Sequence, residues 1–325
     1  YLPRLKFRSA SEGYAVGLYG QVWRTTDAGQ SWSLVAGGSG LESFGSVKFR
    51  SGEGMAASGV GVFRTLDGGA TWENVFGGGA SNDIALLDTS VRVAVGSDIR
   101  RSSDRGENWT TVHPSVSGAL LAVDFVPSTG TATTGVAVGI SGADGLMLRT
   151  TDGGISWSPV SIGTVPALYA VTFSASNPGL GLAGGSNRTL LRTTDGGATW
   201  SPVTMSALGP GETIHAIRFT ATGLIIIAAD GGLYRSTDGG FNWTRVYDST
   251  RGGMADVTFL SATDAVAVGV SGTIVRSADA GATWTAVDVP VTVSLTGVAY
   301  TGIGSEVVAV GDAGTILRNT QGGAP

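Results

Sequence analysis

The stretch RTTDGGATW, from Arg192 to Trp200, decides the fold because it recurs along the whole chain. Seven copies share the pattern R-[ST]-x-D-x-G-x-[STN]-W, and we call each copy a box. The boxes begin at Arg24, Arg64, Arg101, Arg149, Arg192, Arg235 and Arg276. A shorter eighth copy, RNTQGG, begins at Arg318 and has no tryptophan. Repeats of about 40 residues are typical of β-propeller blades.

The residues between the boxes repeat as well. A V-x-F run such as SVKF from Ser46 comes first, and a small apolar run such as VAVG from Val93 follows. Each repeat therefore holds four short strands, of which the third ends in the box and the fourth starts at the box tryptophan. This pattern predicts an all-β fold, a β-propeller of four-stranded antiparallel blades in one domain over residues 1–325. The predicted repeats cover roughly residues 4–35, 43–75, 82–112, 120–160, 168–203, 214–246, 254–287 and 295–320.

Counting the small apolar second strands gives eight blades, and seven blades is the alternative. The eighth unit lacks its tryptophan and its fourth strand, so an eight-bladed ring with a three-stranded last blade fits the count. A segment preceding Tyr1 is the other source of that outer strand. Because the chain starts at Tyr1 and not at Met, we expect a mature or trimmed product.

Every part of the box has a folding role. The aspartate side chain accepts hydrogen bonds from the tip of a tight turn, and the glycines supply positive φ. The tryptophan offers a large apolar plate for packing between neighbouring blades. These residues are therefore interpreted as scaffold. The aspartate and tryptophan pairs are Asp27 and Trp32, Asp67 and Trp72, Asp104 and Trp109, Asp152 and Trp157, Asp195 and Trp200, Asp238 and Trp243, and Asp279 and Trp284.

The box resembles the Asp-box, or BNR repeat, nearly position for position. The arginine three residues before each aspartate is less usual in that motif. On a strand it pairs with an acidic group of the next blade or caps turn carbonyls, which is the structural interpretation. The functional alternative is a ring of positive charge on one face that receives an acidic partner.

The composition excludes several classes of function. Net charge is −5 with no run of like charges, so nucleic-acid binding is not indicated. There is no cysteine, and with only two histidines a metal site or other bound cofactor is not expected. No apolar run reaches the roughly 18 residues of a membrane span.

Candidate binding residues lie just before or in the first strand of each repeat, where they are expected to ring the mouth of the channel. Varied blade-to-blade connections share that face, and loops on a rigid scaffold commonly bind. Simple solvent exposure is the other interpretation of these positions. The candidates are Arg4, Asn82, Asp83, Tyr169, His215 and Asp256.

An enzyme is the less favoured interpretation, and no catalytic residue is assigned. A glycosidase needs two carboxylates across a cleft, and Asp83, Asp124 and Asp256 are the candidates outside the boxes. None stands in a recognisable catalytic pattern. A sialidase, another Asp-box propeller, would carry an F/Y-R-I-P stretch that YLPR at Tyr1 does not match.

The full repeat, V-x-F, then AVG, then G-x-I-x-R-T-T-D-G-G-x-T-W, resembles the Ycf48/HCF136-like family of photosystem II assembly factors. The resemblance covers essentially the full chain, although those factors resemble seven-bladed propellers. It implies a non-catalytic platform in the periplasm, in the thylakoid lumen or at the cell surface, which binds a protein or a membrane complex as an assembly or structural subunit. A carbohydrate-binding or glycoside-hydrolase-like propeller, with a glycan as ligand, is the alternative.

Overall fold

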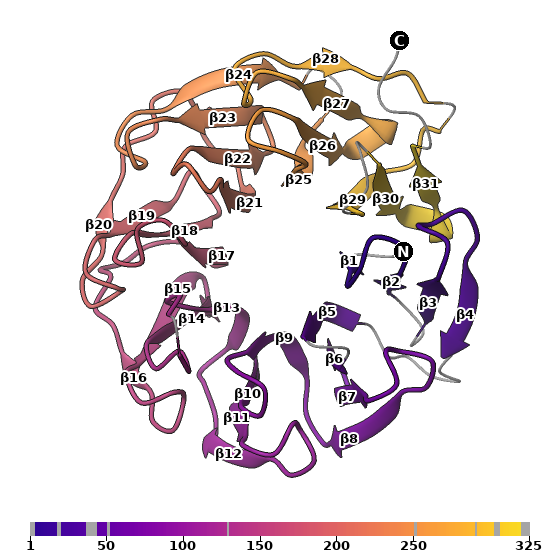
Figure 1. Cartoon of the computed structure of the whole chain (residues 1–325). Helices are drawn as coiled ribbons and strands as arrows, with labels where there is room; N and C mark the ends of the chain where they lie inside the picture. The colour runs from indigo at the N-terminus through magenta and orange to yellow at the C-terminus, as the bar shows by residue number, and fades with distance from the viewer. Residues whose placement is uncertain are drawn as a thin grey trace. The chain divides into compact units, whose positions relative to one another are not determined.

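The chain folds into antiparallel sheets, one for each predicted repeat (Figure 1). The computed structural model describes residues 4–17, 21–36, 44–50, 53–128, 130–249, 252–289, 291–301 and 306–319. In these ranges eight sheets and no α-helix are present, and seven sheets have four strands while the last has three. The prediction of an all-β, eight-bladed β-propeller is therefore confirmed, and the seven-bladed alternative is wrong.

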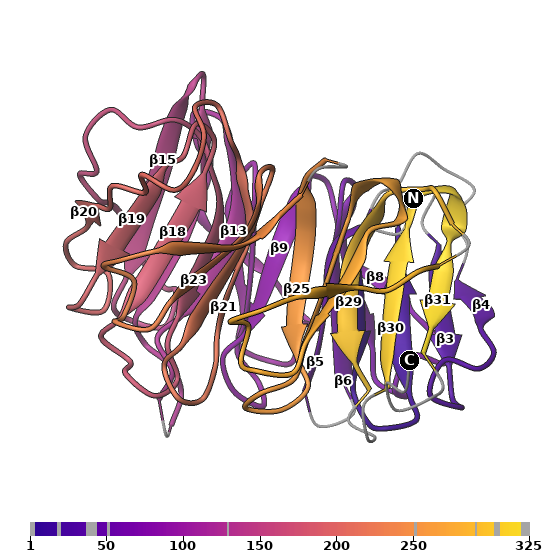
Figure 2. The same cartoon turned by 90° about the horizontal axis from the view of Figure 1, so that it is seen from above.

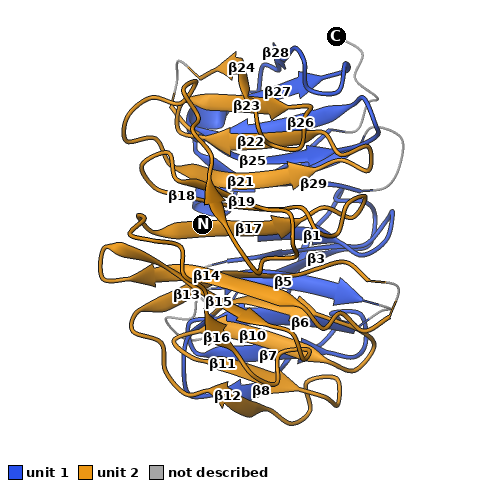
Figure 3. Ribbon diagram, turned by 90° about the vertical axis from the view of Figure 1, so that its left-hand side faces the viewer, with its two compact units in different colours: residues 1–81, 254–325 blue, residues 82–253 orange. Residues whose placement is uncertain are grey.

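The blades fall into two compact units, residues 1–81 with 254–325 and residues 82–253 (Figure 3). The prediction that the whole chain is one domain stays a prediction. The first unit holds β1 (Arg4–Phe7), β2 (Gly13–Val16), β3 (Val22–Thr25), β4 (Ser33–Ala36), β5 (Phe44–Arg50), β6 (Glu53–Ser58), β7 (Gly61–Thr65), β8 (Glu73–Gly77), β25 (Met254–Phe259), β26 (Ala265–Gly269), η1 (Val270–Gly272), β27 (Ile274–Ser277), β28 (Thr285–Ala286), β29 (Leu295–Tyr300), β30 (Val307–Gly311), η2 (Asp312–Gly314) and β31 (Ile316–Arg318).

The second unit holds four complete blades, and β9 starts one residue before it. Its strands are β9 (Ser81–Leu86), β10 (Arg92–Gly96), β11 (Ile99–Ser102), β12 (Thr110–His113), β13 (Ala119–Phe125), β14 (Gly135–Ser141), β15 (Asp144–Thr150), β16 (Ser158–Pro159), β17 (Leu168–Phe173), β18 (Gly181–Gly185), β19 (Leu190–Thr193), β20 (Ser201–Pro202), β21 (Ile214–Phe219), β22 (Ile225–Ala229), β23 (Gly232–Ser236) and β24 (Thr244–Asp248).

Burial explains why the second strand of each blade is the most apolar. All five residues of β22 and all five of β26 are buried. A second strand pairs with a strand on either side and has a neighbouring blade over its faces. Because both of its faces are buried, its sequence is a continuous apolar run. The core consists of clusters between consecutive blades, such as the one that joins Val93 and Ile99 of one blade to Phe125 and Trp157 of the next.

The first strands of consecutive blades lie against one another, as β13, β17 and β21 do in the second unit and β25, β29, β1 and β5 do in the first. Most first strands carry a register shift near their start. The shift lies between Leu168 and Ala170 in β17 and between Ile214 and Ala216 in β21. Such a β-bulge leaves one extra residue, here Tyr169 and His215, outside the ladder.

Candidate functional site

The box aspartate organises its own turn. In the fifth blade, Asp195 Oδ1 accepts hydrogen bonds from the Thr193 hydroxyl at 2.7 Å and the Thr199 N–H at 2.9 Å, and its Oδ2 accepts one from the Thr199 hydroxyl at 2.6 Å. The Thr193 oxygen in turn accepts from the Gly197 N–H at 3.0 Å. The same network recurs in the other boxes with Ser, Thr or Asn in the two polar positions.

These hydrogen bonds hold the box carboxylates in their charged form. The Asn108 N–H, followed by the Ser102 hydroxyl, lowers the pKa of Asp104 to about 2. The Asn242 N–H is also the main cause that lowers the pKa of Asp238 to about 2, against a smaller opposing effect of burial. A carboxylate bonded in this way is a poor general acid at neutral pH, because its proton is already lost.

The box tryptophan and the second box glycine of the fifth blade join it to the fourth. Trp200 is 8% exposed, donates a hydrogen bond from Nε1 to the Gly197 carbonyl at 3.2 Å, and packs in a cluster with Val136 of the preceding blade. Gly197 has φ +82°, and a Cβ there would lie 2.7 Å from Val136 Cγ2. Only glycine combines this backbone conformation with this close approach.

In the second unit, box arginines cap the turn of the next blade. The Nε groups of Arg101, Arg149 and Arg192 donate to the carbonyls of Gly153, Gly196 and Gly239 at 2.8, 3.3 and 2.7 Å.

In the first unit the box arginines pair within their own blades. The pairs are Arg24 with Glu12, Arg64 with Glu73, Arg276 with Asp264 and Arg318 with Glu306. The arginines therefore have a structural role in both units, and the acidic partners of the first unit belong to the same blade and not to the next one.

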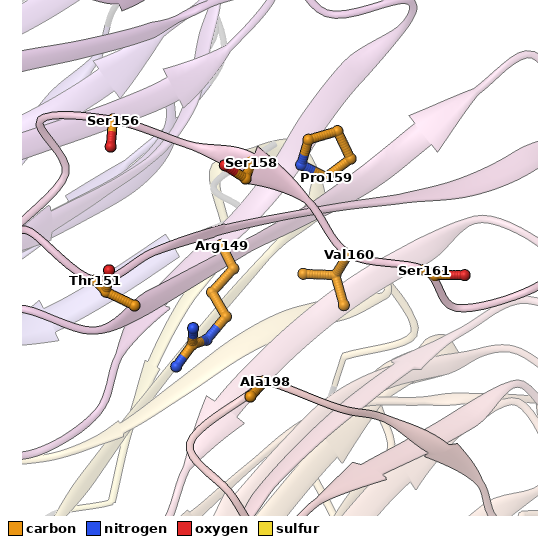
Figure 4. A pocket seen from close by; sticks show the side chains of 8 residues that line it. All are labelled: Arg149, Thr151, Ser156, Ser158, Pro159, Val160, Ser161 and Ala198. Carbon is orange, nitrogen blue, oxygen red and sulfur yellow. The ribbon is translucent and has the colours of Figure 1, made fainter.

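One of the capping arginines also lines a pocket of about 290 Å³ between the fourth and fifth blades (Figure 4). Arg149 lies between Thr151 and Val160, with Ala198 of the next box opposite. The remaining lining is mostly hydroxyl-bearing and comes from Ser156, Ser158, Pro159 and Ser161. A guanidinium among hydroxyls and one apolar wall suits an anionic group such as a carboxylate.

The interface that holds the pocket differs from the next one at one small residue. In the next blade interface, Arg192 is stacked on Phe241, with 3.8 Å from the guanidinium carbon to the ring centroid. Phe241 occupies the position three residues after the box aspartate, and the residue at that position in the preceding box is Ala198. The ring that covers Arg192 has no counterpart over Arg149, where Ala198 lines the pocket instead.

The predicted rim residues divide between the two units. Asn82, Asp83, Tyr169 and His215 lie on first strands of the second unit, and Arg4 and Asp256 lie on first strands of the first unit. Tyr169 is 39% exposed on β17. His215 Nε2 lies 2.7 Å from Asp230 Oδ1 on the adjacent turn of its own blade. Asn82 donates from its side chain to the Leu120 carbonyl at 2.7 Å, which ties β9 to β13.

The three candidate catalytic carboxylates share a structural arrangement. In each of them, one carboxylate oxygen accepts a hydrogen bond from the N–H of the following residue. The other oxygen accepts a hydrogen bond from a main-chain N–H on the first strand of the next blade. The second bond runs from the N–H of Val123 to Asp83 at 3.1 Å, of Phe173 to Asp124 at 2.9 Å, and of Val298 to Asp256 at 3.3 Å. These carboxylates therefore join neighbouring blades.

The sequence reasoning missed Ala198 as a residue of the candidate site. An alanine at a variable box position carries no signal by itself. Aligning the boxes on one another would have found it, because the same position holds Ile155 and Phe241 in the boxes on either side.

The described ranges contain neither a cluster of metal-ligating side chains nor a membrane-spanning helix. No group of three His, Asp or Glu side chains in these ranges is arranged to hold a metal ion. Among the same residues, no helix has the length and apolar character needed to span a membrane.

Solved structures share this fold at low identity. A structure of YCF48 bound to D1 peptide has a TM-score of 0.61 at 20% identity and covers 98% of this chain and 92% of its own. YCF48 from Cyanidioschyzon merolae has a TM-score of 0.61 at 19% identity over 86% and 93% of the two chains. The GH74 xyloglucanase from Xanthomonas campestris has a TM-score of 0.63 at 14% identity over 100% and 73%. At these identities the likeness shows the fold alone.

No curated protein matches the chain. The family described as Photosynthesis system II assembly factor YCF48 matches residues 100–272, which is more than half of the chain. The match runs from the third strand of the third blade through the second strand of the seventh, and it includes four complete boxes and the Arg149 pocket. The family resemblance of the repeats is thereby confirmed. The chain belongs to the family of photosynthesis system II assembly factor YCF48.

Proposed function

We propose that this protein is a non-catalytic platform outside the cytoplasm that binds a partner protein during the assembly of a membrane complex. Family membership supports the assembly role, and the structure of YCF48 bound to D1 peptide supports a protein ligand. The observation that carries the proposal in this chain is the pocket at Arg149, whose guanidinium and hydroxyl groups suit an acidic side chain or a chain terminus of the partner.

The placement of the carboxylates supports binding over catalysis. Asp83 and Asp124 each hold two main-chain N–H groups, one of them from the next blade. A glycosidase acid must carry a proton and face the substrate, which conflicts with this use of both oxygens.

The test fills the pocket by a substitution at a variable position of the box. Ala198→Phe places at this interface the side chain that Phe241 already places at the next one, so the turn is expected to accept it. We expect this variant to recover at least tenfold less partner from the membrane fraction of the source cells than the unchanged protein does, as measured by quantitative mass spectrometry. Ala282→Phe, at the same position of another box, is the matched control and should retain the partner.

Two results would overturn the proposal. One is equal recovery of the same membrane proteins by both phenylalanine variants and the unchanged protein. The other is selective binding to a glycan array that Ala198→Phe abolishes, because it would assign the pocket to a carbohydrate.

A further inference from the structure

Two exposed apolar side chains lie on the box turns on either side of the Arg149 pocket. Ile155 belongs to the box of the fourth blade and Phe241 to the box of the sixth, while the pocket lies between the fourth and fifth blades. The three blades are neighbours in the second unit, because β13 contacts β17 and β17 contacts β21 (Figure 2). Ile155 is 58% exposed and Phe241 is 61% exposed, more than any other large apolar side chain in the described ranges.

Large apolar residues occur at this box position only next to the pocket. Ile155 and Phe241 stand three residues after the box aspartate, and Ala198 holds that position in the box between them. The other four complete boxes have Gln30, Ala70, Glu107 and Ala282 there. Single exposed apolar residues need no explanation, whereas apolar residues gathered around a polar pocket mark a binding surface.

Both apolar residues are held in place before any ligand binds. The Ile155 N–H donates to Asp152 Oδ1 at 3.0 Å, and the Phe241 N–H donates to Asp238 Oδ1 at 3.1 Å. The Phe241 ring is also stacked on the Arg192 guanidinium. The protein therefore loses little conformational entropy when a ligand covers these side chains, which favours binding.

The Arg149 guanidinium has donors available for a ligand. Its Nε donates to the Gly196 carbonyl at 3.3 Å, and its Nη groups have no acceptor among the residues that the structure describes. The acidic residue nearest to it in the sequence, Asp152, accepts hydrogen bonds from within its own turn with both carboxylate oxygens. The two Nη groups can therefore bind both oxygens of one ligand carboxylate.

This arrangement fits an acidic residue inside a chain better than a chain terminus. An apolar side chain lies on each side of the pocket, so an extended segment that contacts both must continue past its carboxylate in both directions. A terminal carboxylate ends the chain, and an extended segment that places it in the pocket reaches only one of the two apolar residues.

We propose that the box turns of the fourth, fifth and sixth blades bind an extended partner segment with one acidic residue between two apolar ones. The acidic side chain enters the Arg149 pocket, and the apolar side chains pack on Ile155 and on Phe241. The inference rests on the protein-binding function proposed above and names the kind of segment that the pocket takes. The apolar contacts exclude water around the charge pair, and the charge pair fixes the register of the segment.

Peptides with blocked ends test this pattern. One set carries a glutamate between two leucines in a chain of glycine and serine, and the matched set carries serines in place of the leucines. Because an extended chain covers about 3.3 to 3.6 Å per residue, leucines about two to six residues from the glutamate lie about 7 to 20 Å from it. In calorimetric titration of the whole protein, at least one leucine peptide should bind at least tenfold more tightly than its serine counterpart.

Variants of the two apolar residues test where the leucines bind. Ile155→Ser and Phe241→Gln should each weaken the best leucine peptide at least threefold and leave its serine counterpart unchanged. Glutamine keeps a side chain over Arg192, so this substitution does not uncover a second guanidinium. Leu66→Ser is the matched control, because Leu66 is a box residue that is 55% exposed but belongs to the first unit. This variant should bind both peptides as the unchanged protein does.

A photoreactive leucine analogue locates the contacts directly. Placed at each leucine position of the best peptide in turn, it should form crosslinks to the boxes of the fourth and sixth blades, residues 149–157 and 235–243. Mass spectrometry of the digested complexes identifies the crosslinked residues. Crosslinks from both positions to a single box would contradict the arrangement on two sides of the pocket.

Other results would also overturn the inference. One is equal affinity of every leucine peptide and its serine counterpart, and another is tighter binding of a peptide that has a free terminal carboxylate and a single leucine. If Arg149→Gln weakens those peptides, the pocket keeps its proposed function and only the flanking contacts are wrong. Absence of binding by any peptide at millimolar concentration would overturn the inference as well. Partner recovery by the Ala198→Phe variant then still decides the proposed function.

Discussion

Phe241 stacks on Arg192 with 3.8 Å between ring centroid and guanidinium carbon, whereas Arg149 in the preceding interface faces Ala198 and a pocket. The two arginines cap the next turn in the same way. The two interfaces therefore differ in the side chain that faces the box arginine.

Removing that ring should open a second pocket. Phe241→Ala uncovers Arg192, and we expect the number of bound acidic peptides per chain, measured by calorimetry, to rise from one to two. The loss of an exposed cation–π contact should cost about 0.5 to 1 kcal/mol of stability. An unchanged stoichiometry would mean that the alanine alone does not make the Arg149 pocket.

Truncating a box tryptophan should test its role in joining blades. Trp200→Ala removes a side chain that is 8% exposed and packs against the preceding blade, so we expect a loss of about 3 to 5 kcal/mol in chemical denaturation. Trp109→Ala, at a half-buried tryptophan, should cost less. Equal losses for the two variants would contradict the dependence on burial.

The paired box glycines should differ in their tolerance of alanine. Gly196→Ala and Gly197→Ala both place alanine at positive φ, +68° and +82°. The added methyl is 3.7 Å from Val126 in the first case but 2.7 Å from Val136 in the second. We expect Gly197→Ala to lose about 1 to 3 kcal/mol more than Gly196→Ala in denaturant titration. Val136→Ala should recover part of that difference if the clash is its cause.

Acid should unfold the protein through the box carboxylates. The pKa of Asp104 and of Asp238 is about 2 in the folded chain, below the value of about 3.9 in an unfolded chain. Their contribution is present above the unfolded pKa and is lost as pH falls through the folded pKa. The denaturation midpoint should therefore drop between about pH 4 and pH 2. Asp238→Asn should reduce this dependence, and an identical profile would contradict it.

The Asp124 carboxylate should stabilise the contact between two neighbouring blades. Asp124→Ala leaves the Phe173 N–H without its acceptor and should cost about 1 to 3 kcal/mol in thermal or chemical unfolding. Asp124→Asn keeps a carbonyl acceptor and should be milder. If the unchanged protein hydrolysed a glycan and the folded Asp124→Asn variant did not, the carboxylate would be catalytic and the structural interpretation would be wrong.

The sequence repeats alone were enough to predict most of the fold. Box spacing, the apolar second strands and the tryptophan at the start of each fourth strand were enough to predict eight blades and their strand order, because these features depend on local turns and on short-range burial. The absence of a tryptophan after Arg318 agrees with the three strands that the described residues of the last blade form.

The candidate sites depend on contacts between side chains of different blades. A local sequence pattern does not reveal such contacts. Asp83 and Asp256 look like rim carboxylates in the sequence, yet each accepts an N–H from the next blade. The Arg149 pocket depends on which side chain a different repeat, some 50 residues further on, places over the guanidinium. The sequence determined the number and content of the blades, and the packing of one blade on the next decided which arginine lines a pocket.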